Sequence, residues 1–321
     1  IITIAYILSS NRKKIDWKTI IIGLSSQFII AIGVIKVDFV RKFFEIIGQG
    51  FLAIVTFSSE GSTFLFGELA NSDSFGVIFV FQVLPVIIFF SALTSILYYY
   101  KIIQRIVRVF AWLLTKLLNI SGQESLAVTG NIFLGQTEAP LLVKGYLDKM
   151  NRSEYFVLMT GGLAAVAGSV LAAYIGLLGG NDINEQLKFS NHLLTASVMA
   201  APGAVAISKI IFPEETKSVK EEIKIETKNK NGNILLSITK GTIEGVKLAV
   251  NVGAMLLVFL AFIALLNDIM WLIGESLNFN VLISESTSFD QFSIEFVLGY
   301  LFAPLMWLIG VTYQECAIMG Q

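Results

Sequence analysis

The stretch from residue 121 to residue 147 concentrates polar side chains within apolar sequence. It reads SGQESLAVTGNIFLGQTEAPLLVKGYL and contains Asn131, Gln136, Thr137 and Glu138. An amide that donates and accepts, a hydroxyl and a carboxylate could together bind the edge of a heterocycle. The alternative is a polar cluster that only holds helices together. We favour the binding role because helix-breaking residues fall within the same stretch.

Three residues, Gly130, Gly135 and Pro140, interrupt this stretch. They leave apolar blocks shorter than the ~20 residues that a membrane span needs. An acidic residue at the centre of a spanning helix would cost roughly 2.5–3.5 kcal/mol. Broken backbone at membrane depth is tolerated where protein buries it or where it lines a watery cavity, and such segments mark binding sites in secondary transporters. The sequence therefore predicts a re-entrant helical hairpin over 121–147 that enters and leaves on the inner side.

A second interruption lies at 160–170, which reads TGGLAAVAGSV. Its glycines, Gly161, Gly162 and Gly168, would permit close packing of helices. They would equally permit local unwinding, which exposes backbone carbonyls that could coordinate a cation. The pattern alone leaves both interpretations open.

The composition excludes a soluble globular protein. The 321 residues are 55% hydrophobic and 15% charged, with a mean hydropathy of +0.74, whereas soluble domains average about 25% charged residues. The net charge of −1 provides no basic field for nucleic acid. A single cysteine, Cys316, and a single histidine, His192, exclude a disulfide framework and multi-histidine metal sites. We therefore expect an integral membrane protein, with an intramembrane enzyme or a channel as more distant alternatives; no catalytic motif supports the enzyme.

Several apolar blocks are long enough to span a bilayer and should be helices, because backbone polar groups in hydrocarbon must pair internally. The predicted spans are 19–35, 75–100, 156–179, 193–212, 246–266 and 292–310. Connections rich in Lys and Arg are placed in the cytoplasm, and the acidic ones outside. The stretch 101–120 has one apolar face and one basic face, which suits a helix in the cytoplasmic interface or a buried linker helix.

These observations predict an all-α, polytopic helical membrane protein. We expect N-terminal transmembrane helices over 1–100, of which the first is partial, and a cytoplasmic interfacial helix over 101–120. The re-entrant hairpin covers 121–147, and transmembrane helices that include a broken helix cover 148–212. A charged cytoplasmic linker over 213–233 then leads to scaffold helices over 234–321.

Five strings along the chain resemble the concentrative nucleoside transporter family. In order, they are NIFLGQTEAPLLVK, MTGGLAAVAGSVLAAYIG, HLLTASVMAAPGAVAISKIIFPE, EGVKLAVNVGAMLLVFLAFIALLN and FAPLMWLIGV. The resemblance implies a secondary-active symporter, not an enzyme, that imports nucleosides with sodium, or alternatively with protons, and needs no cofactor. It further implies a homotrimer in the bacterial cytoplasmic (inner) membrane, with a scaffold domain and a moving transport domain that carries two re-entrant hairpins.

The resemblance also implies roles for individual residues. The residues that would contact the nucleobase are Gly135, Gln136, Thr137, Glu138 and Val170. The residues that would form the sodium site are Asn131, the carbonyl of Leu134, Ala165 and Val166.

The sequence departs from the family pattern in three ways. Ala165 stands where sodium-coupled relatives usually have Ser or Thr, so a proton-coupled protein or a weaker sodium site is expected. Gly145 replaces a proline, which should loosen the exit of the hairpin. The second hairpin and the ribose-binding helix of the family do not occur before Gln321. We therefore expect the chain to be a fragment, truncated at the C-terminus and also at Ile1, that does not transport by itself.

Overall fold

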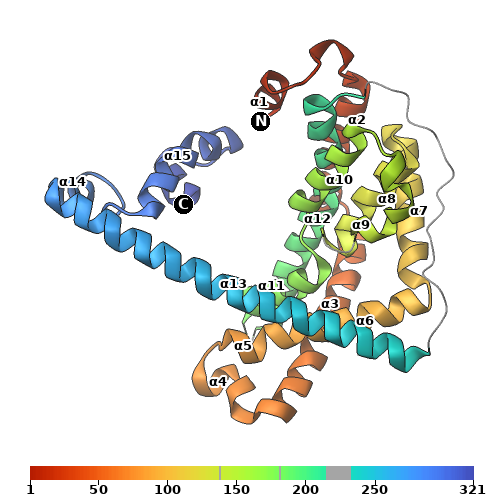
Figure 1. The fold of residues 1–321 in the computed structure, drawn as a ribbon, viewed down its shortest axis with the longest axis horizontal. Coiled ribbons are helices and arrows are strands. Elements are labelled where there is room, and N and C mark those ends of the chain that lie inside the picture. Colours follow the sequence, from red (N-terminus) through yellow and green to blue (C-terminus); the bar gives the residue numbers. More distant parts are fainter. Residues whose placement is uncertain (137–138, 181, 215–232) are drawn as a thin grey trace. The chain divides into compact units, whose positions relative to one another are not determined.

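The computed structural model describes residues 1–136, 139–180, 182–214 and 233–321, and only the backbone of Ser72, Asp73 and Leu141 (Figure 1). Within these ranges every regular element is a helix. The predicted all-α class is therefore confirmed. The predicted charged linker at 213–233 lies almost entirely outside the described residues.

The helices follow one another along the whole chain. Their bounds are α1 Ile2–Ile7, η1 Arg12–Lys14, α2 Trp17–Lys36, α3 Asp38–Phe66, η2 Gly67–Ala70, α4 Ser72–Phe75, α5 Phe79–Gln82, α6 Leu84–Tyr99, α7 Ile102–Leu118, α8 Gly122–Phe133, α9 Ala139–Leu142, η3 Lys144–Lys149, α10 Arg152–Ala164, α11 Gly168–Gly179, α12 Ile183–Ile211, α13 Ile234–Ser276, α14 Phe279–Ser286, α15 Ile294–Ile309 and α16 Cys316–Gly320.

Five helical segments among the described residues are long and apolar enough to cross a membrane. They are α2, α5 with α6, α10 with α11, α12 and α13. The prediction from sequence missed α3 entirely, because charged residues at its start and middle interrupt its apolar run. Helix α15 has 16 residues, which is shorter than the ~20 residues of a typical span that we predicted over 292–310.

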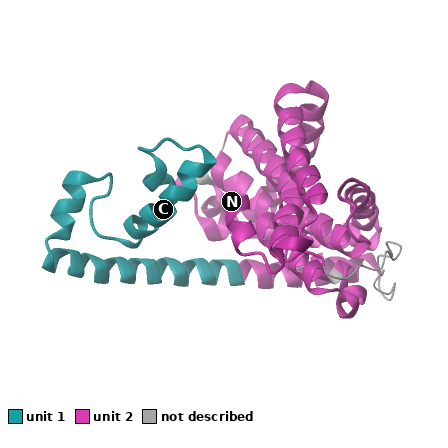
Figure 2. Ribbon diagram, turned by 90° about the horizontal axis from the view of Figure 1, so that it is seen from above, with its two compact units in different colours: residues 1, 251–321 teal, residues 2–250 magenta. Residues whose placement is uncertain are grey.

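The chain divides into two compact units (Figure 2). One unit consists of residues 2–250, and the other contains Ile1 and residues 251–321. In the second unit, Asn267 holds the start of α15: its Oδ1 accepts the backbone N–H of Ile294 at 2.8 Å, and its Nδ2 donates to Glu295 at 3.0 Å. Asn280 likewise joins Trp271 and Phe292 through hydrogen bonds of 3.0 Å each.

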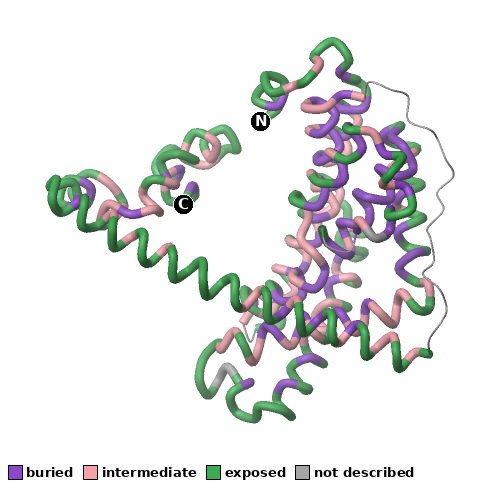
Figure 3. The backbone as a smooth tube through the Cα atoms, in the orientation of Figure 1, coloured by how far each residue is buried: buried purple, intermediate pink, exposed green. Residues whose placement is uncertain are grey.

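In the unit of residues 2–250, helix α8 forms the first part of the predicted hairpin and is buried along almost its whole length (Figure 3). It packs against α7, α10 and α12, and α12 in turn packs against α2, α3, α10 and α11. Apolar residues of α8, including Leu126 and Val128, belong to the two clusters that join it to these neighbours. A helix that carries this many polar residues is thus enclosed by protein on nearly all sides.

Local signals explain where the helices around α8 begin and end. Asn119 adopts a left-handed conformation (φ 53°) and ends α7. Ser121 and Glu124 then form a capping box that starts α8, in which each side chain accepts the other residue's backbone N–H. Asn151 and Glu154 form a second capping box at the start of α10. The two helices that carry the candidate site are therefore fixed at their first turns.

Helix α7 has one buried face and one exposed face, and its position in the cytoplasmic interface stays a prediction. Ile103, Val107 and Ala111 are buried and pack on the cluster that includes α8. Its exposed face presents Trp112 and Leu113 beside basic residues, as an interfacial helix would.

Candidate functional site

The tip of the predicted hairpin lies between α8 and α9. Helix α8 ends at Phe133, and the N–H of Leu134 still donates to the carbonyl of Gly130 at 2.8 Å. Gly135 then takes a positive φ of 85°, which L side chains rarely adopt, and the chain turns toward α9. The glycine that the sequence singled out as an interruption is thus the residue that reverses the chain.

The helix predicted to be broken is interrupted between α10 and α11. Ala165 is extended (φ −107°, ψ 149°), and α11 resumes at Gly168 after an extended Ala167. The last carbonyls of α10 and the first N–H groups of α11 lack intrahelical partners, as at every helix end. Since no side chain caps α11, the break presents both acceptors and donors to whatever lies against it.

The hairpin tip lies directly against this break. A Cβ added to Gly135 would lie 2.9 Å from the Cα of Ala167, and one added to Gly168 would lie 2.6 Å from the carbonyl oxygen of Phe133. One added to Gly162 would lie 2.9 Å from the Cβ of Gln136. Glycine is therefore required on both sides of the contact, because any side chain would separate tip from break.

Asn131 occupies the last turn of α8, below the tip. It is 1% exposed, and its Nδ2 donates to the carbonyl of Leu158 on α10 at 3.2 Å. Its Oδ1 has no hydrogen-bond partner in the described part of the chain. A Cβ added to Gly162 would lie 3.5 Å from that oxygen. A buried amide oxygen without a partner, beside the end of α10, is a ready ligand for a cation.

The structure brings several predicted site residues to one place and leaves others undescribed. The tip residues Gly135 and Gln136 meet the broken helix at Ala167 and Gly162, on either side of Ala165. Val166 packs its side chain into an apolar cluster with Leu171 and Leu194, so only its backbone carbonyl could bind an ion.

Two of the predicted nucleobase contacts, Thr137 and Glu138, lie outside the described residues. Val170 is half-buried in the first turn of α11. The prediction from sequence missed Ala167 and the carbonyl of Leu158. The glycines at 161 and 162 could have indicated the close approach, but nothing in the sequence pattern identifies the partner carbonyl.

Two helix C-terminal ends at the junction favour a cation, whereas the N-terminus of α11 at the same break carries partial positive charge. The C-terminal ends of α8 and α10 both lie there, and each carries a partial negative charge from its free carbonyls. In the described ranges, no cluster of His, Cys, Asp or Glu could hold a metal ion. Among the described residues at this junction, the Asn131 amide oxygen and the backbone carbonyls are oxygen ligands suited to a hard ion.

An apolar cavity of about 260 Å³ lies beside the tip. Its lining includes Phe51 of α3, Phe90 of α6, Val107 of α7 and, at the tip, Phe133 and Leu134. Thr94, whose hydroxyl donates to the carbonyl of Phe90, is the one polar side chain in a lining that is otherwise apolar. The polar side of the tip, toward α10 and α11, is therefore the better candidate for binding a polar heterocycle.

Family models match three consecutive parts of the chain. The model described as the N-terminus of Na⁺-dependent nucleoside transporters matches residues 1–69. The model described as nucleoside recognition matches 80–181, and the model described as the C-terminus of Na⁺-dependent nucleoside transporters matches 192–321. The middle model contains both the hairpin and the broken helix.

Relatives match over nearly the whole chain. The uncharacterized transporter YutK of Bacillus subtilis is 39% identical over 323 residues, which cover 100% of this chain and 75% of YutK. Sodium/nucleoside cotransporter 2 of Rattus norvegicus is 34% identical over 100% of this chain and 45% of its own length. The chain thus spans less than half of the mammalian protein.

Solved structures of one protein, CNTnw, match the fold in more than one state. An inward-facing, substrate-bound state superposes with a TM-score of 0.86 and 34% identity, covering 99% of this chain and 72% of CNTnw. An outward-facing state gives a TM-score of 0.87 at the same identity.

Proposed function

Because this chain belongs to the concentrative, Na⁺-dependent nucleoside transporter family, we propose that it serves to carry nucleosides across a membrane together with a cation. The family is one of transporters, so the chain is not an enzyme. The observation that carries the proposal is the contact of the hairpin tip with the broken helix, beside a buried amide oxygen that has no hydrogen-bond partner among the described residues. Such pairs of interrupted segments hold substrate and coupling ion in secondary transporters.

The nucleobase binds on the polar side of the tip. Gln136 is exposed there and offers both a donor and an acceptor. Thr137 and Glu138 add a hydroxyl and a carboxylate, Gly135 keeps the backbone close, and Val170 contributes an apolar contact from α11. A pocket of neutral hydrogen-bonding groups with one carboxylate suits an uncharged solute that must also be released.

The coupling ion binds below the nucleobase. Its ligands are the Oδ1 of Asn131 and the carbonyls of Leu134, Ala165 and Val166. The free carbonyls at the ends of α8 and α10 favour positive charge at this point. We propose sodium as the ion, in line with the family description.

One observation favours a second candidate, a proton-coupled carrier. Ala165, at the end of α10, has no hydroxyl and can offer only its carbonyl. A sodium ion would thus lose one oxygen ligand and bind more weakly. If sodium binds only weakly at this site, a proton gradient is the alternative driving force for transport.

We infer the membrane and the assembly by analogy with relatives. Similar proteins occur in Bacillus subtilis and Haemophilus influenzae, which supports the bacterial cytoplasmic membrane. Exposed apolar residues on α13, such as Phe259 and Leu260, provide surface for lipid or for neighbouring subunits. We propose a homotrimer that needs no cofactor and binds no nucleic acid.

Uptake of radiolabelled uridine tests the proposal. The full-length gene product, in cells without their own nucleoside carriers, should accumulate uridine against its gradient, and Glu138→Gln should lose at least nine-tenths of this uptake at unchanged membrane abundance. Replacing sodium with choline separates the two couplings, since a proton-coupled carrier would keep most of its uptake. Failure to accumulate any nucleoside would contradict the proposed function, and normal uptake by Glu138→Gln would contradict the role of that carboxylate.

A further inference from the structure

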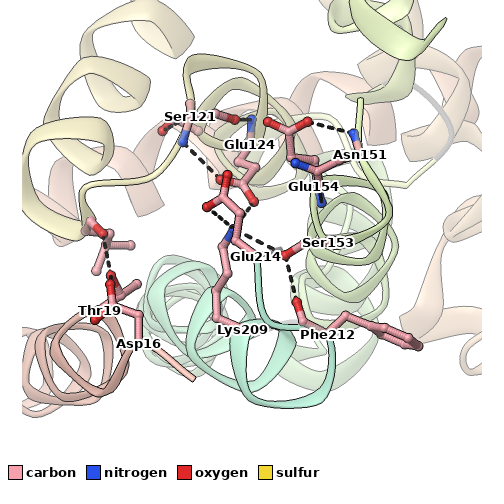
Figure 4. Close-up of polar contacts among 12 residues, drawn as sticks. Asp16, Thr19, Ser121, Glu124, Asn151, Ser153, Glu154, Lys209, Phe212 and Glu214 are labelled. Atoms are coloured by element: carbon pink, nitrogen blue, oxygen red, sulfur yellow. Dashed lines mark hydrogen bonds and ion pairs between the residues drawn. The ribbon is translucent and has the colours of Figure 1, made fainter. Parts of the chain in front are cut away.

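An ion pair with almost no exposure to solvent lies at the base of the hairpin, away from its tip. The Nζ of Lys209, near the end of α12, is 2.5 Å from Oε1 of Glu124 in the first turn of α8 (Figure 4). The Glu124 side chain is 0% exposed and that of Lys209 is 6% exposed. Lys209 also lies 3.3 Å from a carboxylate oxygen of Glu214, which is partly exposed.

Hydrogen bonds extend this pair to a third helix. Lys209 donates to Oγ of Ser153 at 3.3 Å, and Ser153 donates in turn to the carbonyl of Phe212 at 2.7 Å. The second oxygen of Glu124 accepts the backbone N–H of Ser121 at 2.9 Å. The network therefore joins the beginning of α8, the beginning of α10 and the end of α12, as Figure 4 shows.

A buried ion pair is a poor way to gain stability. Removing two charges from water costs about as much as their attraction returns, and apolar residues of similar volume often do as well or better. The pair is directional, however, and it fixes one helix against another at a single rotation and height. We therefore expect the pair to matter mainly for how the two helices are positioned against each other.

That geometry reaches the candidate cation ligand. Glu124 and Asn131 stand seven positions apart in α8, which is about two turns and about 10 Å of rise. They therefore lie on the same face of the helix. Asn131 bonds to α10 through Leu158, and Glu124 reaches α10 through Lys209 and Ser153. Helix α8 is thus held against α10 at two points on one face, one at its base and one below its tip.

We propose that Lys209 is a positioning residue for the site: its pair with Glu124 sets the rotation and height of α8, and so holds the amide oxygen of Asn131 at the break. This inference rests on the proposed function, because it concerns the affinity of that site. Without the pair, α8 can rotate or slide by a fraction of a turn, and the amide oxygen moves away from the carbonyls of α10.

The test compares two lysines of one helix. Lys209→Met removes the buried cation, and Lys188→Met removes an exposed lysine of α12, 61% exposed, that pairs with Glu185 on the surface. In the full-length gene product we expect Lys209→Met to raise the cation concentration for half-maximal uridine uptake about tenfold or more, and Lys188→Met to leave it unchanged. Membrane abundance is measured alongside, since Lys209→Met strands a buried carboxylate and can lower the amount of folded protein.

The neutral pair Glu124→Gln with Lys209→Met separates positioning from folding. It leaves no uncompensated buried charge, so it should reach the membrane at the level of the unaltered protein, yet it should keep the raised half-saturation concentration because the tether is gone. A neutral pair with an unaltered half-saturation concentration would overturn the proposal and leave the proposed function intact. Absence of uptake of any nucleoside by the unaltered protein would overturn both.

Discussion

The Nδ2 of Asn131 donates a 3.2 Å hydrogen bond to the carbonyl oxygen of Leu158. This bond fixes the amide so that its other end, Oδ1, faces the region where α10 stops. The bond also joins the hairpin to the broken helix. A carbonyl oxygen has two lone pairs, so that of Leu158 can accept from Asn131 as well as from a donor in α10. One end of the amide therefore holds the two segments together, and the other end has no hydrogen-bond partner among the described residues.

Replacing Asn131 with leucine should weaken cation binding. Leucine has the same branching, but it removes the amide oxygen and the hydrogen bond to the carbonyl of Leu158, which contributes about 0.5–1.5 kcal/mol. We expect the cation concentration for half-maximal uridine uptake to rise more than tenfold. The matched control is Asn191→Leu, because Oδ1 of Asn191 is also unpaired in the described part of the chain but lies near Gly48 of α3. Equal effects of the two changes would contradict the assignment.

Replacing Gly135 with alanine should open the contact between tip and break. The positive φ of 85° is strained for alanine, at a cost of order 1–3 kcal/mol, and the new methyl group would meet Ala167. We expect uridine uptake to fall more than tenfold while membrane abundance stays within about twofold. Gly67→Ala is the control, because Gly67 also has a positive φ but has nothing within 4 Å of an added Cβ. Uptake that Gly135→Ala leaves unchanged would show that the contact is dispensable.

The sequence anticipates features that depend on neighbouring residues. The interruption at Gly135, the interruption within 160–170 and the all-α class follow from residue types. The described residues show the chain turning at Gly135, a break after Ala164 and only helices as regular elements. The prediction from sequence missed helix α3, because charged residues such as Asp38 and Arg41 near its start interrupt the apolar pattern of a continuous helix. The periodicity of apolar residues identifies the buried face of a helix. It fails to identify a helix where charged and apolar residues are mixed near the helix end.

Contacts between distant segments could not be predicted. The pairing of Glu124 with Lys209, and of Asn131 with the carbonyl of Leu158, depends on which helices pack together. A lysine near the end of an apolar helix is typical of the membrane interface, so sequence alone would have placed Lys209 in water. Such pairs depend on tertiary packing, which cannot be read from the spacing of residues within either segment.

Restoring a hydroxyl at Ala165 should strengthen sodium coupling. Ala165 is half-buried and extended at the end of α10, and Ala165→Ser would add one hard oxygen ligand without changing the backbone. We expect the sodium concentration for half-maximal uptake to fall by up to about tenfold, which corresponds to ~1.4 kcal/mol. Ala164→Ser, one residue earlier in the same turn, is the control. A decrease in sodium affinity, or no change, would indicate that Ala165 does not face the ion.

Protection of an introduced thiol by nucleoside tests the central claim most directly. In a background where Cys316 is replaced by serine, Val170→Cys places a thiol in the first turn of α11, and Leu178→Cys places one on the same helix at an exposed position away from the break. If tip and break form the nucleoside site, saturating uridine should slow alkylation of the thiol at position 170 at least severalfold and leave that at 178 unchanged. Equal alkylation rates at position 170 with and without uridine, in protein that still takes up uridine, would contradict the account.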